Sequence, residues 1–553
     1  MKTLTEILTF SLLLNCIFTP YGLCDNHNNA AYPSVVIQQV RFDPNNTDTW
    51  IYNTGIFNID LRPPNPPGFQ WPKGSGHFAI FTSGLTLAAY VNNQLRVASC
   101  SYAGELAPGY VTISLGEPVA HTDSRFKIYK VSRGDNMYTN PDWLNWGYMV
   151  PYGAPYVDVN SNNIYEPLLD TPGVKDASQT LFVCMTDGFP ESHISGEGFG
   201  GGTLPLFAEV HLTAWGYDNV VGAEDVQFLK WDIINKNTHP WNRTYFSIFC
   251  DPDLGCSEDD YIGCDSVRQL GFCYNSDNDD GGCSYGYGVS PPALGIKWLT
   301  CFQNSVHLNS FVPYVSSNIP GFCGPPNAYQ IIRGFKNDGS WWLNPKVIQG
   351  SRKTKYVFSG DPESNNGWNC SDGIIDNCGG DTTGNIVHPT GVDWRFVMSA
   401  GADNFTLNPN DRRTVMIAQF MARGSNNLNS VTKLKLLDNR IQSLCDSGFL
   451  IGINNINTTL PNSFYLYQNY PNPFNPVTKI KFQIPSVGAR YIVPVKLVIY
   501  DVLGREVTTL VNEKLNHGTY VADWDGTNYS SGVYFYKLIT GEFIETKKMV
   551  LIK

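Results

Sequence analysis

Three closely spaced prolines near the end of the chain, Pro471, Pro473 and Pro476, limit what this region can fold into. Each proline fixes its φ angle at about −65° and lacks a backbone N–H group. The residue before a proline is also pushed towards extended conformations. The stretch YQNYPNPFNPVTKIKF (467–482) therefore cannot form a helix, and we expect a stiff, extended segment there.

The residues around and after these prolines have the pattern of antiparallel strands. Apolar and polar residues alternate, and a period of two marks a strand with one buried face. Turn-forming residues separate the strand patterns. The strand patterns are KIKFQI (479–484), VKLVIY (495–500) and VYFYKLI (533–539), and the turns are DVLG (501–504) and DGTNYSSG (525–532). We therefore expect residues 464–553 to form a small antiparallel β-sandwich.

The same region carries several motifs in a specific order. They are NYPNPFNP (469–476), YDVLGR (500–505), WDG (524–526), SGVYFY (531–536) and a lysine-bearing end. On these motifs the region resembles the type A C-terminal sorting domain of the type IX (Por) secretion system, and also the immunoglobulin-like domain of flagellar hook-capping proteins. The resemblance implies an immunoglobulin-like sandwich that the outer-membrane export and sorting machinery recognises. In that family the domain is often cleaved while the cargo is released or anchored at the surface.

The first 24 residues have the pattern of a secretory signal peptide. Lys2 precedes an apolar run from about residue 7 to residue 18, and Pro20 and Gly22 lead to a cleavage site near Cys24. The run is too short for a stable membrane anchor. A signal peptide and a sorting domain together predict passage through the periplasm and outer membrane, to the medium or the outer cell surface. The net charge of −11 argues against a nucleic-acid partner.

The large region between these two signals is predicted to be β-rich. We place the body at residues 25–449, a polar linker at 450–463 and the sorting domain at 464–553. The body is expected to be a large β-sandwich with long loops, or two sandwiches, and it resembles the uncharacterised N-terminal bodies of type IX cargo proteins. One helix is predicted over 430–449, with Ser430 as N-cap and Gly448 as its end. The fold class is all-β.

Fourteen cysteines occur, and twelve remain once Cys16 and Cys24 leave with the signal peptide. An even number in an oxidising compartment predicts disulfides. Five cysteines lie between residues 250 and 283, where we expect local pairs, and we also expect a Cys370–Cys378 bond. Zinc binding by the cluster is the weaker alternative, because it has no Cys-x-x-Cys spacing and no histidine. His211, which stands alone in the sequence, is interpreted as structural.

Calcium is the cofactor that the acidic loops predict. Calcium loops place oxygen ligands at alternate positions and a carboxylate near position 12. The stretch DVNSNNIYEPLLD (158–170) fits this spacing, although its last carboxylate falls one place late and Asn163 replaces the usual glycine. Its candidate ligands are Asp158, Asn160, Asn162, the carbonyl of Ile164, Glu166 and Asp170. The alternative is a loop of Asx-turns that binds nothing.

A second acidic stretch, DPDLGCSEDDYIGCD (251–265), holds six carboxylates without a Lys or Arg. Such crowding is repulsive, and a cation would relieve it. The candidate calcium ligands here are Asp251, Asp253, Asp259 and Asp260. The following stretch NSDNDDGG (275–282) either adds to this site or is a solvated loop tip.

The body has no nucleophile motif and no site residue that we can assign to catalysis or to an organic cofactor. We expect a calcium-stabilised binding, adhesion or surface-coat module, with extracellular glycans or other surface proteins as partners. The alternative is a secreted polysaccharide-active hydrolase. A hydrolase needs two carboxyls facing each other across an aromatic-lined cleft, roughly 5–10 Å apart. Carboxylates that converge on one point favour a bound cation instead.

Overall fold

A computed structural model gives the fold of the chain. It describes residues 37–553, except 64–65, 113–117, 120–122, 195–198, 221, 316–323, 377–383, 389–391, 450–452, 458–462, 486–491, 517, 528 and 542. The predicted signal peptide, residues 1–24, lies outside the described residues. None of the helices in the described part is both long enough and apolar enough to cross a membrane.

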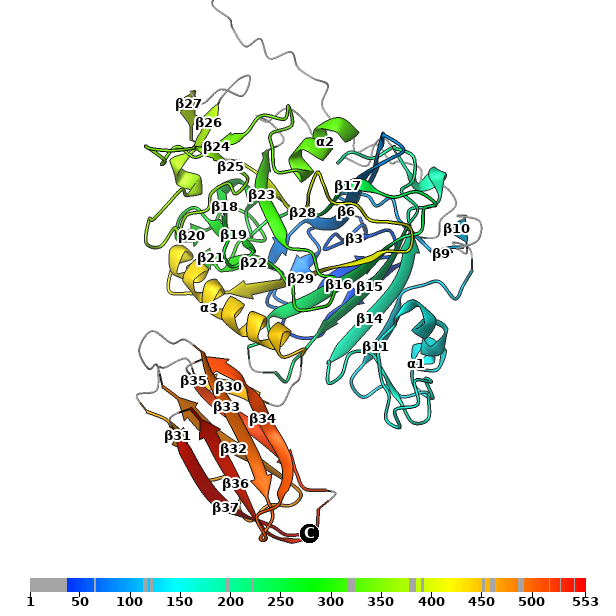
Figure 1. Cartoon of the computed structure of the whole chain (residues 1–553). Coiled ribbons are helices and arrows are strands. Elements are labelled where there is room, and N and C mark those ends of the chain that lie inside the picture. Colours follow the sequence, from blue (N-terminus) through cyan, green and yellow to red (C-terminus); the bar gives the residue numbers. More distant parts are fainter. Residues whose placement is uncertain are drawn as a thin grey trace, which may run out of the picture. The chain divides into compact units, whose positions relative to one another are not determined.

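The chain divides into two compact units (Figure 1). Among the described residues, one unit contains those up to Gly216 together with Asp225–Asn439, and the other contains Tyr217–Glu224 and Arg440–Lys553. We use "body" for the described residues of the first unit and "small domain" for the strands from β30 (Ile453–Asn457) onwards.

Two large antiparallel sheets form the body. The first has the order β1 (Gln39–Phe42), β2 (Thr49–Tyr52), β3 (Ile56–Phe57), β6 (Thr82–Val91), β17 (Asn242–Asp251), β28 (Trp394–Gly401), β23 (Leu308–Val315), with β7 (Gln94–Ala98) on β6. The second has the order β11 (Tyr129–Ser132), β14 (Gln179–Thr186), β15 (Ala208–Gly216), β16 (Val226–Asn235), β29 (Arg412–Ala422), β22 (Ala293–Trp298), β19 (Leu270–Asn275), β18 (Asp260–Asp265), with β8 (Ala107–Pro108) on β14.

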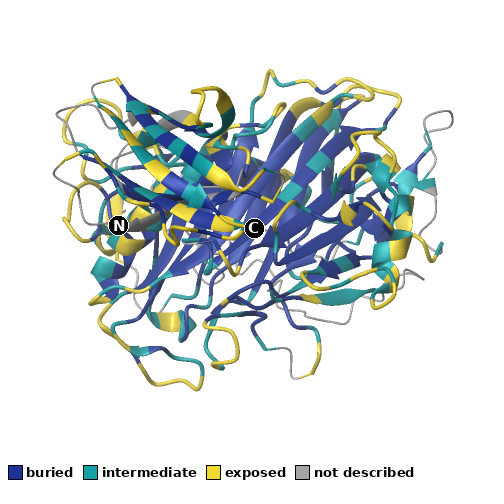
Figure 2. Cartoon of the chain, turned by 90° about the horizontal axis from the view of Figure 1, so that it is seen from below, coloured by how far each residue is buried: buried dark blue, intermediate teal, exposed yellow. Residues whose placement is uncertain are grey.

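The inner faces of the two sheets enclose a continuous apolar core. The ring of Phe57 in the first sheet lies 5.7 Å from the ring of Trp231 in the second. Next to it, the side-chain amide of Asn58 donates to Gln419 Oε1 at 2.9 Å. Figure 2 shows that the central strands are mostly buried, whereas exposed residues concentrate on the loops around them. The predicted all-β fold and large β-sandwich are confirmed.

A smaller layer covers the outer face of β14 and β15. It contains α1 (Pro141–Asn145), η1 (Trp146–Tyr148) and η2 (Val150–Tyr152). Side chains alternate between the two faces of a strand. Phe182 and Cys184 of β14 therefore pack with this layer, whereas Leu181 and Val183 lie in the main core.

One long helix, α3 (Asn427–Asp446), is present near the position predicted for residues 430–449. It begins earlier than predicted, because the Asn426 side chain accepts a backbone N–H of the first turn at 2.7 Å and so takes the capping role. Ser430 is instead a buried residue inside the helix. Gly448 has a φ of 67° and follows the last turn, as predicted for the end of the helix.

The small domain contains two four-stranded antiparallel sheets over its described residues. Their orders are β30, β35 (Gly518–Asp525), β32 (Val477–Ile484), β31 (Tyr465–Leu466), and β34 (Glu506–Asn516), β33 (Ile492–Tyr500), β36 (Gly532–Thr540), β37 (Ile544–Leu551). Apolar residues from both sheets form one buried cluster. The small sandwich is thus confirmed, and its immunoglobulin-like topology stays a prediction.

The proline-rich motif packs against the core of the small domain. Phe474 is 2 % exposed, and its ring lies 5.3 Å from the ring of Trp524. The N–H of Phe474 donates to the carbonyl of Val550 at 2.9 Å, so the motif pairs with β37. Asn469 is also buried, and its amide donates to Thr478 Oγ1 at 2.9 Å. The motif is therefore a packed part of the sandwich as well as an extended segment.

We expect Phe474→Ala to lower the free energy of unfolding of the small domain by about 3–5 kcal/mol, because it leaves a cavity beside Trp524. Tyr470 belongs to the same motif but is 80 % exposed. Tyr470→Ala should therefore change the stability by no more than about 0.5 kcal/mol. Hydrogen exchange of peptides from residues 464–553 in the full-length protein measures both effects. Equal exchange in the two variants would contradict the packing role of Phe474.

Candidate metal centre

Three aspartates meet where β17 and β28 run side by side. Asp251 ends β17, Asp253 lies in the loop that follows, and Asp393 directly precedes β28. The register pairs Cys250 with Phe396, which places Asp251 beside the start of β28. One carboxylate oxygen of each aspartate lies within 4.8 Å of the corresponding oxygens of the other two. We call this group the Asp trio. Asp393 could not be predicted from the sequence, because no local pattern links it to residues 251–265.

The guanidinium group of Arg395 lies beside the Asp trio. Its Nε is 3.3 Å from Asp251 Oδ1, and its Nη2 is 2.9 Å from Asp393 Oδ2. The hydroxyl of Tyr102 donates to Asp251 Oδ2 at 2.7 Å. The Oδ1 atoms of Asp251 and Asp393 are buried and accept no hydrogen bond from the described residues. One guanidinium charge does not balance three carboxylates, and two oxygens keep free lone pairs.

Burial opposes ionisation of the Asp trio. It raises the pKa of Asp251 to about 7, and the nearby charge of Asp393 adds to the effect. Burial and the neighbouring carboxylates raise the pKa of Asp253 well above its ordinary value, and burial also raises the pKa of Asp393. A divalent cation among these oxygens would favour their charged forms. The Asp393 side chain is 36 % exposed, so the group can be reached from solvent.

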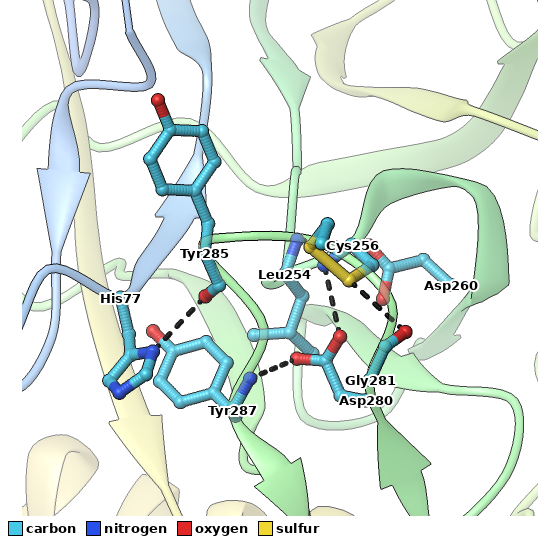
Figure 3. The surroundings of a disulfide bond; sticks show 9 residues. His77, Leu254, Cys256, Asp260, Asp280, Gly281, Tyr285 and Tyr287 are labelled. Carbon is cyan, nitrogen blue, oxygen red and sulfur yellow. Dashed lines mark hydrogen bonds between the residues drawn. A yellow bond between two sulfur atoms is a disulfide. The ribbon is translucent and has the colours of Figure 1, made fainter.

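Other carboxylates of the acidic loops hold the backbone (Figure 3). Asp260 Oδ2 accepts the N–H of Leu254 at 2.9 Å. Asp280, in β20 (Asp279–Asp280), accepts the N–H groups of Cys256 and Tyr287 at 3.0 and 2.7 Å. These bonds fix the loop that leads away from Asp253. Asp260 therefore supports the loop, and it is not among the residues whose oxygens converge in the Asp trio.

The disulfide Cys256–Cys283 ties the two acidic loops together, with Cα atoms 5.7 Å apart (Figure 3). It confirms the prediction of local pairs between residues 250 and 283 only in part, because Cys250, Cys264 and Cys273 form no disulfide. Asp259 lies next to it in η4 (Ser257–Asp259), outside the Asp trio. Burial raises the pKa of Asp259 and, more strongly, that of Asp260.

Among the remaining cysteines, Cys301 and Cys445 are disulfide-bonded. Several others are buried thiols. The predicted Cys370–Cys378 bond is wrong, because Cys370 is a free, buried thiol; Cys378 lies outside the described residues. The other cysteine thiols of the described part are Cys100, Cys184, Cys250, Cys264 and Cys273. Most of them lie in strands of the sheets, where the extended backbone keeps cysteines that are close in sequence apart in space.

In the predicted calcium loop, which follows β12 (Tyr156–Val157), the carboxylates accept hydrogen bonds from other groups of the same loop. Asp158 accepts the N–H groups of Asn162 and Asn163 at 3.2 and 2.7 Å. Glu166 Oε2 accepts the side-chain amides of Asn160 and Asn162 at 2.8 and 2.7 Å. The structure therefore gathers these predicted ligands into one exposed loop.

Asp170 and Asn163 complete this loop. Asp170 is 1 % exposed and accepts the N–H groups of Val159 and Glu166 at 3.0 and 2.8 Å. Asn163 has a φ of 61°, the left-handed conformation expected where a calcium loop has glycine. Ile164, whose carbonyl is the remaining predicted ligand, is 63 % exposed. Since Asx-turn bonds also account for this geometry, the calcium and Asx-turn interpretations both stay predictions.

A separate hollow of about 260 Å³ lies on the first sheet. Its lining comprises Arg41, Asp48, Trp50, Asp60, Arg62, Pro67, Gly68, Gln70 and Phe78. Arg41 Nε donates to Asp48 Oδ1 at 2.7 Å, and Arg62 Nε donates to Asp60 Oδ1 at 2.8 Å. Each guanidinium also bonds the second oxygen of its carboxylate through Nη2. Both Arg side chains are about half exposed, and the guanidinium of Arg62 lies over the Trp50 ring, 4.4 Å from its centroid.

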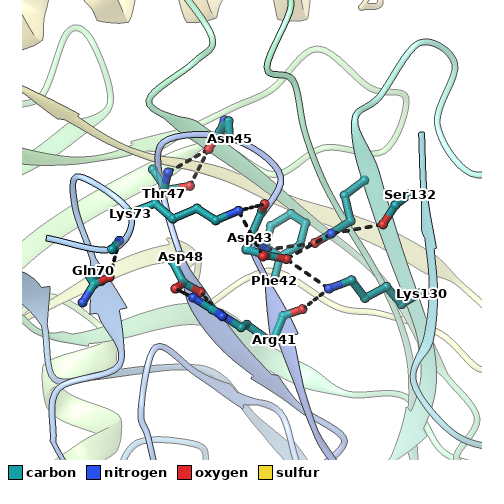
Figure 4. Close-up of polar contacts among 12 residues, drawn as sticks. Arg41, Phe42, Asp43, Asn45, Thr47, Asp48, Gln70, Lys73, Lys130 and Ser132 are labelled. Atoms are coloured by element: carbon teal, nitrogen blue, oxygen red, sulfur yellow. Dashed lines mark hydrogen bonds and ion pairs between the residues drawn. The ribbon is translucent and has the colours of Figure 1, made fainter. Parts of the chain in front are cut away.

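A partly exposed ion network supports one side of this hollow (Figure 4). Asp43, just after β1, contacts Lys73 Nζ at 3.0 Å, Lys130 Nζ at 3.1 Å and Gln179 Nε2 at 3.1 Å. Burial alone would raise the pKa of Asp43, but these hydrogen bonds hold it below its usual range. The contacts join β1 of the first sheet to β11 and β14 of the second, and so they fix Arg41.

The small domain is identified by comparison with protein families. Residues 468–553 match the family described as Secretion system C-terminal sorting domain. This part of the chain is a type IX sorting domain. No curated protein matches the chain. The sorting domain implies interaction with the type IX export machinery, and it directs the protein to the cell surface or the medium.

We expect the Asp trio to make the stability of the chelator-treated protein depend on pH. The pKa of Asp251 is raised to about 7 in the folded state, against about 3.9 in an unfolded chain. The folded state thus binds the Asp251 proton more tightly than the unfolded chain does. The stabilisation that this proton gives the folded state is complete below about pH 4, and it is lost as the pH rises through about 7. We expect a loss on the order of 4 kcal/mol between pH 4 and 8, measured by urea unfolding in EDTA.

Asp393→Asn should reduce this loss, because it removes a negative charge next to Asp251. Asp338→Asn, at an exposed aspartate elsewhere in the body, serves as the control and should leave the pH profile unchanged. A profile that is the same in all three proteins would show that the Asp trio does not govern it.

Proposed function

We propose that the body is a calcium-stabilised binding module that its sorting domain delivers to the cell surface. The observation that carries the proposal is the convergence of three carboxylate oxygens within 4.8 Å of one another in the Asp trio. Calcium binds oxygen ligands at about 2.3–2.6 Å, so ligands on opposite sides of one ion are roughly 5 Å apart. The spacing in the trio therefore suits one shared ion.

The charge balance supports the same proposal. Arg395 offsets one of the three carboxylates, and the Oδ1 atoms of Asp251 and Asp393 accept no hydrogen bond from the described residues. A calcium ion would bind these oxygens and relieve the repulsion between them. Because Asp251 and Asp253 lie at the end of β17 and Asp393 lies just before β28, the ion would tie these two segments of the body together.

The hollow lined by Trp50 favours binding over the alternative of polysaccharide hydrolysis. A glycosidase needs one carboxylic acid whose pKa is raised, to protonate the leaving group. Asp48 and Asp60 are instead each held by a guanidinium through two hydrogen bonds. Burial would raise the pKa of Asp60, but the hydrogen bonds from Arg62 lower it. These carboxylates therefore suit hydrogen bonding to a ligand better than acid catalysis.

Extracellular glycans are the ligand class that this hollow fits best. Sugars bind to sites that combine an aromatic surface with fixed polar groups, and here Trp50 and Phe78 lie beside two oriented guanidiniums and Gln70. Other surface proteins are the competing partner class.

We expect calcium to raise the melting temperature of the EDTA-treated protein at pH 8. Calcium at 100 times its dissociation constant should add about 2.7 kcal/mol. Asp251→Asn and Asp393→Asn should each remove most of this increase, whereas Asp158→Asn should remove only a weaker component that requires millimolar calcium. Differential scanning calorimetry measures the shifts. An unchanged transition in the wild-type protein would discard the calcium proposal.

We expect Trp50→Ala to reduce glycan binding roughly tenfold or more, because it removes an aromatic ring of the hollow and the surface on which the Arg62 guanidinium is stacked. A glycan array identifies the ligand, and calorimetric titration measures its affinity. Tyr138→Ala, at an aromatic residue that is 84 % exposed elsewhere in the body, is the matched control and should bind normally. Glycan binding that survives Trp50→Ala would place the ligand elsewhere, and release of reducing sugar would favour the hydrolase.

A further inference from the structure

A second group of metal-ligand side chains lies on the outer face of the second sheet. The register of β14 and β15 places Cys184 opposite His211, and Glu209 lies two residues before His211. Because side chains alternate along a strand, all three point to the same face, towards the layer formed by α1, η1 and η2. One ligand atom of each residue lies within 4.8 Å of the corresponding atoms of the other two.

These three residues are fully enclosed. Cys184 is 0 % exposed, and the side chains of Glu209 and His211 are 5 % and 3 % exposed. Met149 and Trp146 of the covering layer belong to the same buried cluster as Cys184. Nothing in the sorting function or in the Asp trio makes use of this group.

The hydrogen bonds of the group leave metal-binding atoms available. His211 Nε2 lies 3.0 Å from Glu209 Oε1, so this ring nitrogen, and not Nδ1, faces the carboxylate. Nδ1 points away from Glu209 and is buried without a hydrogen-bond partner in the described part of the chain. With the ring proton on Nδ1, the lone pair of Nε2 is directed to the same side as the Glu209 carboxylate. Cys184 is a free thiol, whose Sγ donates to the carbonyl of Gly109 at 3.2 Å.

We propose that Cys184, Glu209 and His211 bind a zinc ion. Zinc takes thiolate, imidazole and carboxylate ligands together, whereas calcium binds oxygen and does not take sulfur. On binding, the Cys184 thiol loses its proton to water and the sulfur bonds to the metal. The thiolate and carboxylate then balance the charge of Zn²⁺. Lys236, whose Nζ lies 3.9 Å from Glu209 Oε2, is the neighbouring positive charge.

A nucleophilic Cys–His–Glu arrangement would use the same residue types, but the environment opposes it. Burial raises the pKa of the Cys184 thiol, and an activated thiolate needs the reverse. A substrate would also have to reach a sulfur that has no exposed surface. Enclosure has a different consequence for a metal: the ion enters as the chain folds and afterwards exchanges slowly. The site is independent of the proposed calcium and glycan functions.

The test uses Co²⁺ as a spectroscopic probe for zinc. The full chain is unfolded, refolded with Co²⁺ in the presence of excess Ca²⁺, which keeps the Asp trio occupied, and then dialysed against chelator. We expect one retained cobalt per chain, with a thiolate-to-cobalt charge-transfer band and the intense visible bands of tetrahedral coordination. Refolding with Zn²⁺ should abolish these bands. A protein that retains no cobalt would overturn the proposal.

Two variants assign the sulfur ligand. Cys184→Ser should lose the charge-transfer band, whereas Cys264→Ser, at a buried free thiol in β18, should keep it. A band that survives Cys184→Ser would overturn the assignment. If Cys184→Ser fails to fold, X-ray absorption at the zinc edge of refolded wild-type protein decides the question. One sulfur and at least two lighter ligands support the site, and a shell of nitrogen and oxygen alone overturns it.

Discussion

The antiparallel ladders that place β28 and β29 inside the two sheets hold the body together. Strand β28 lies between β17 and β23 in the first sheet, and β29 lies between β16 and β22 in the second. Each of these strands comes from near the end of the body and pairs with strands from its middle. Both sheets are therefore incomplete until residues 394–422 are in place. The same pairing brings Asp393 and Arg395 to Asp251, so the candidate metal centre exists only in the assembled sheet.

Local patterns predicted the local structure, and they failed where distant segments meet. The alternation in residues 479–484 and the prolines before it predicted β32 and its extended lead-in, because strand period and proline geometry act over a few residues. The helix start was displaced, since Asn426 and Ser430 are both good caps and only packing decides between them. Asp393 was missed for a stronger reason: its role depends on which strand lies beside β17. The predicted Cys370–Cys378 bond was wrong for a similar reason, because sequence spacing says nothing about whether a side chain faces the core.

The pKa values of the aspartates in the body differ according to the charges around each carboxylate. Asp43 is largely surrounded by hydrogen-bond donors and two lysines, and its pKa is lowered despite the burial. Asp251 and Asp253 share one guanidinium with Asp393, and their pKa values are raised. The first arrangement is a completed ion network that holds two sheets together. The second has an excess of negative charge, which a fold keeps at a cost unless something positive binds there. This difference separates a supporting carboxylate from a candidate ligand, and no count of acidic residues in the sequence reveals it.

The sorting domain completes its own core, and this bears on how it can serve different cargo. The contacts described for its motif, from Phe474 to Trp524 and Val550 and from Asn469 to Thr478, join residues of the domain itself. The motifs of this domain can be identified in the sequence because they are the residues that build its sandwich, whatever precedes them in the chain. The body differs from the sorting domain, because its two sheets, its outer layer and its ligand clusters depend on pairing between distant strands. The export signal can therefore be identified from short motifs, whereas the activity of the body must be inferred from atoms that only the fold brings together.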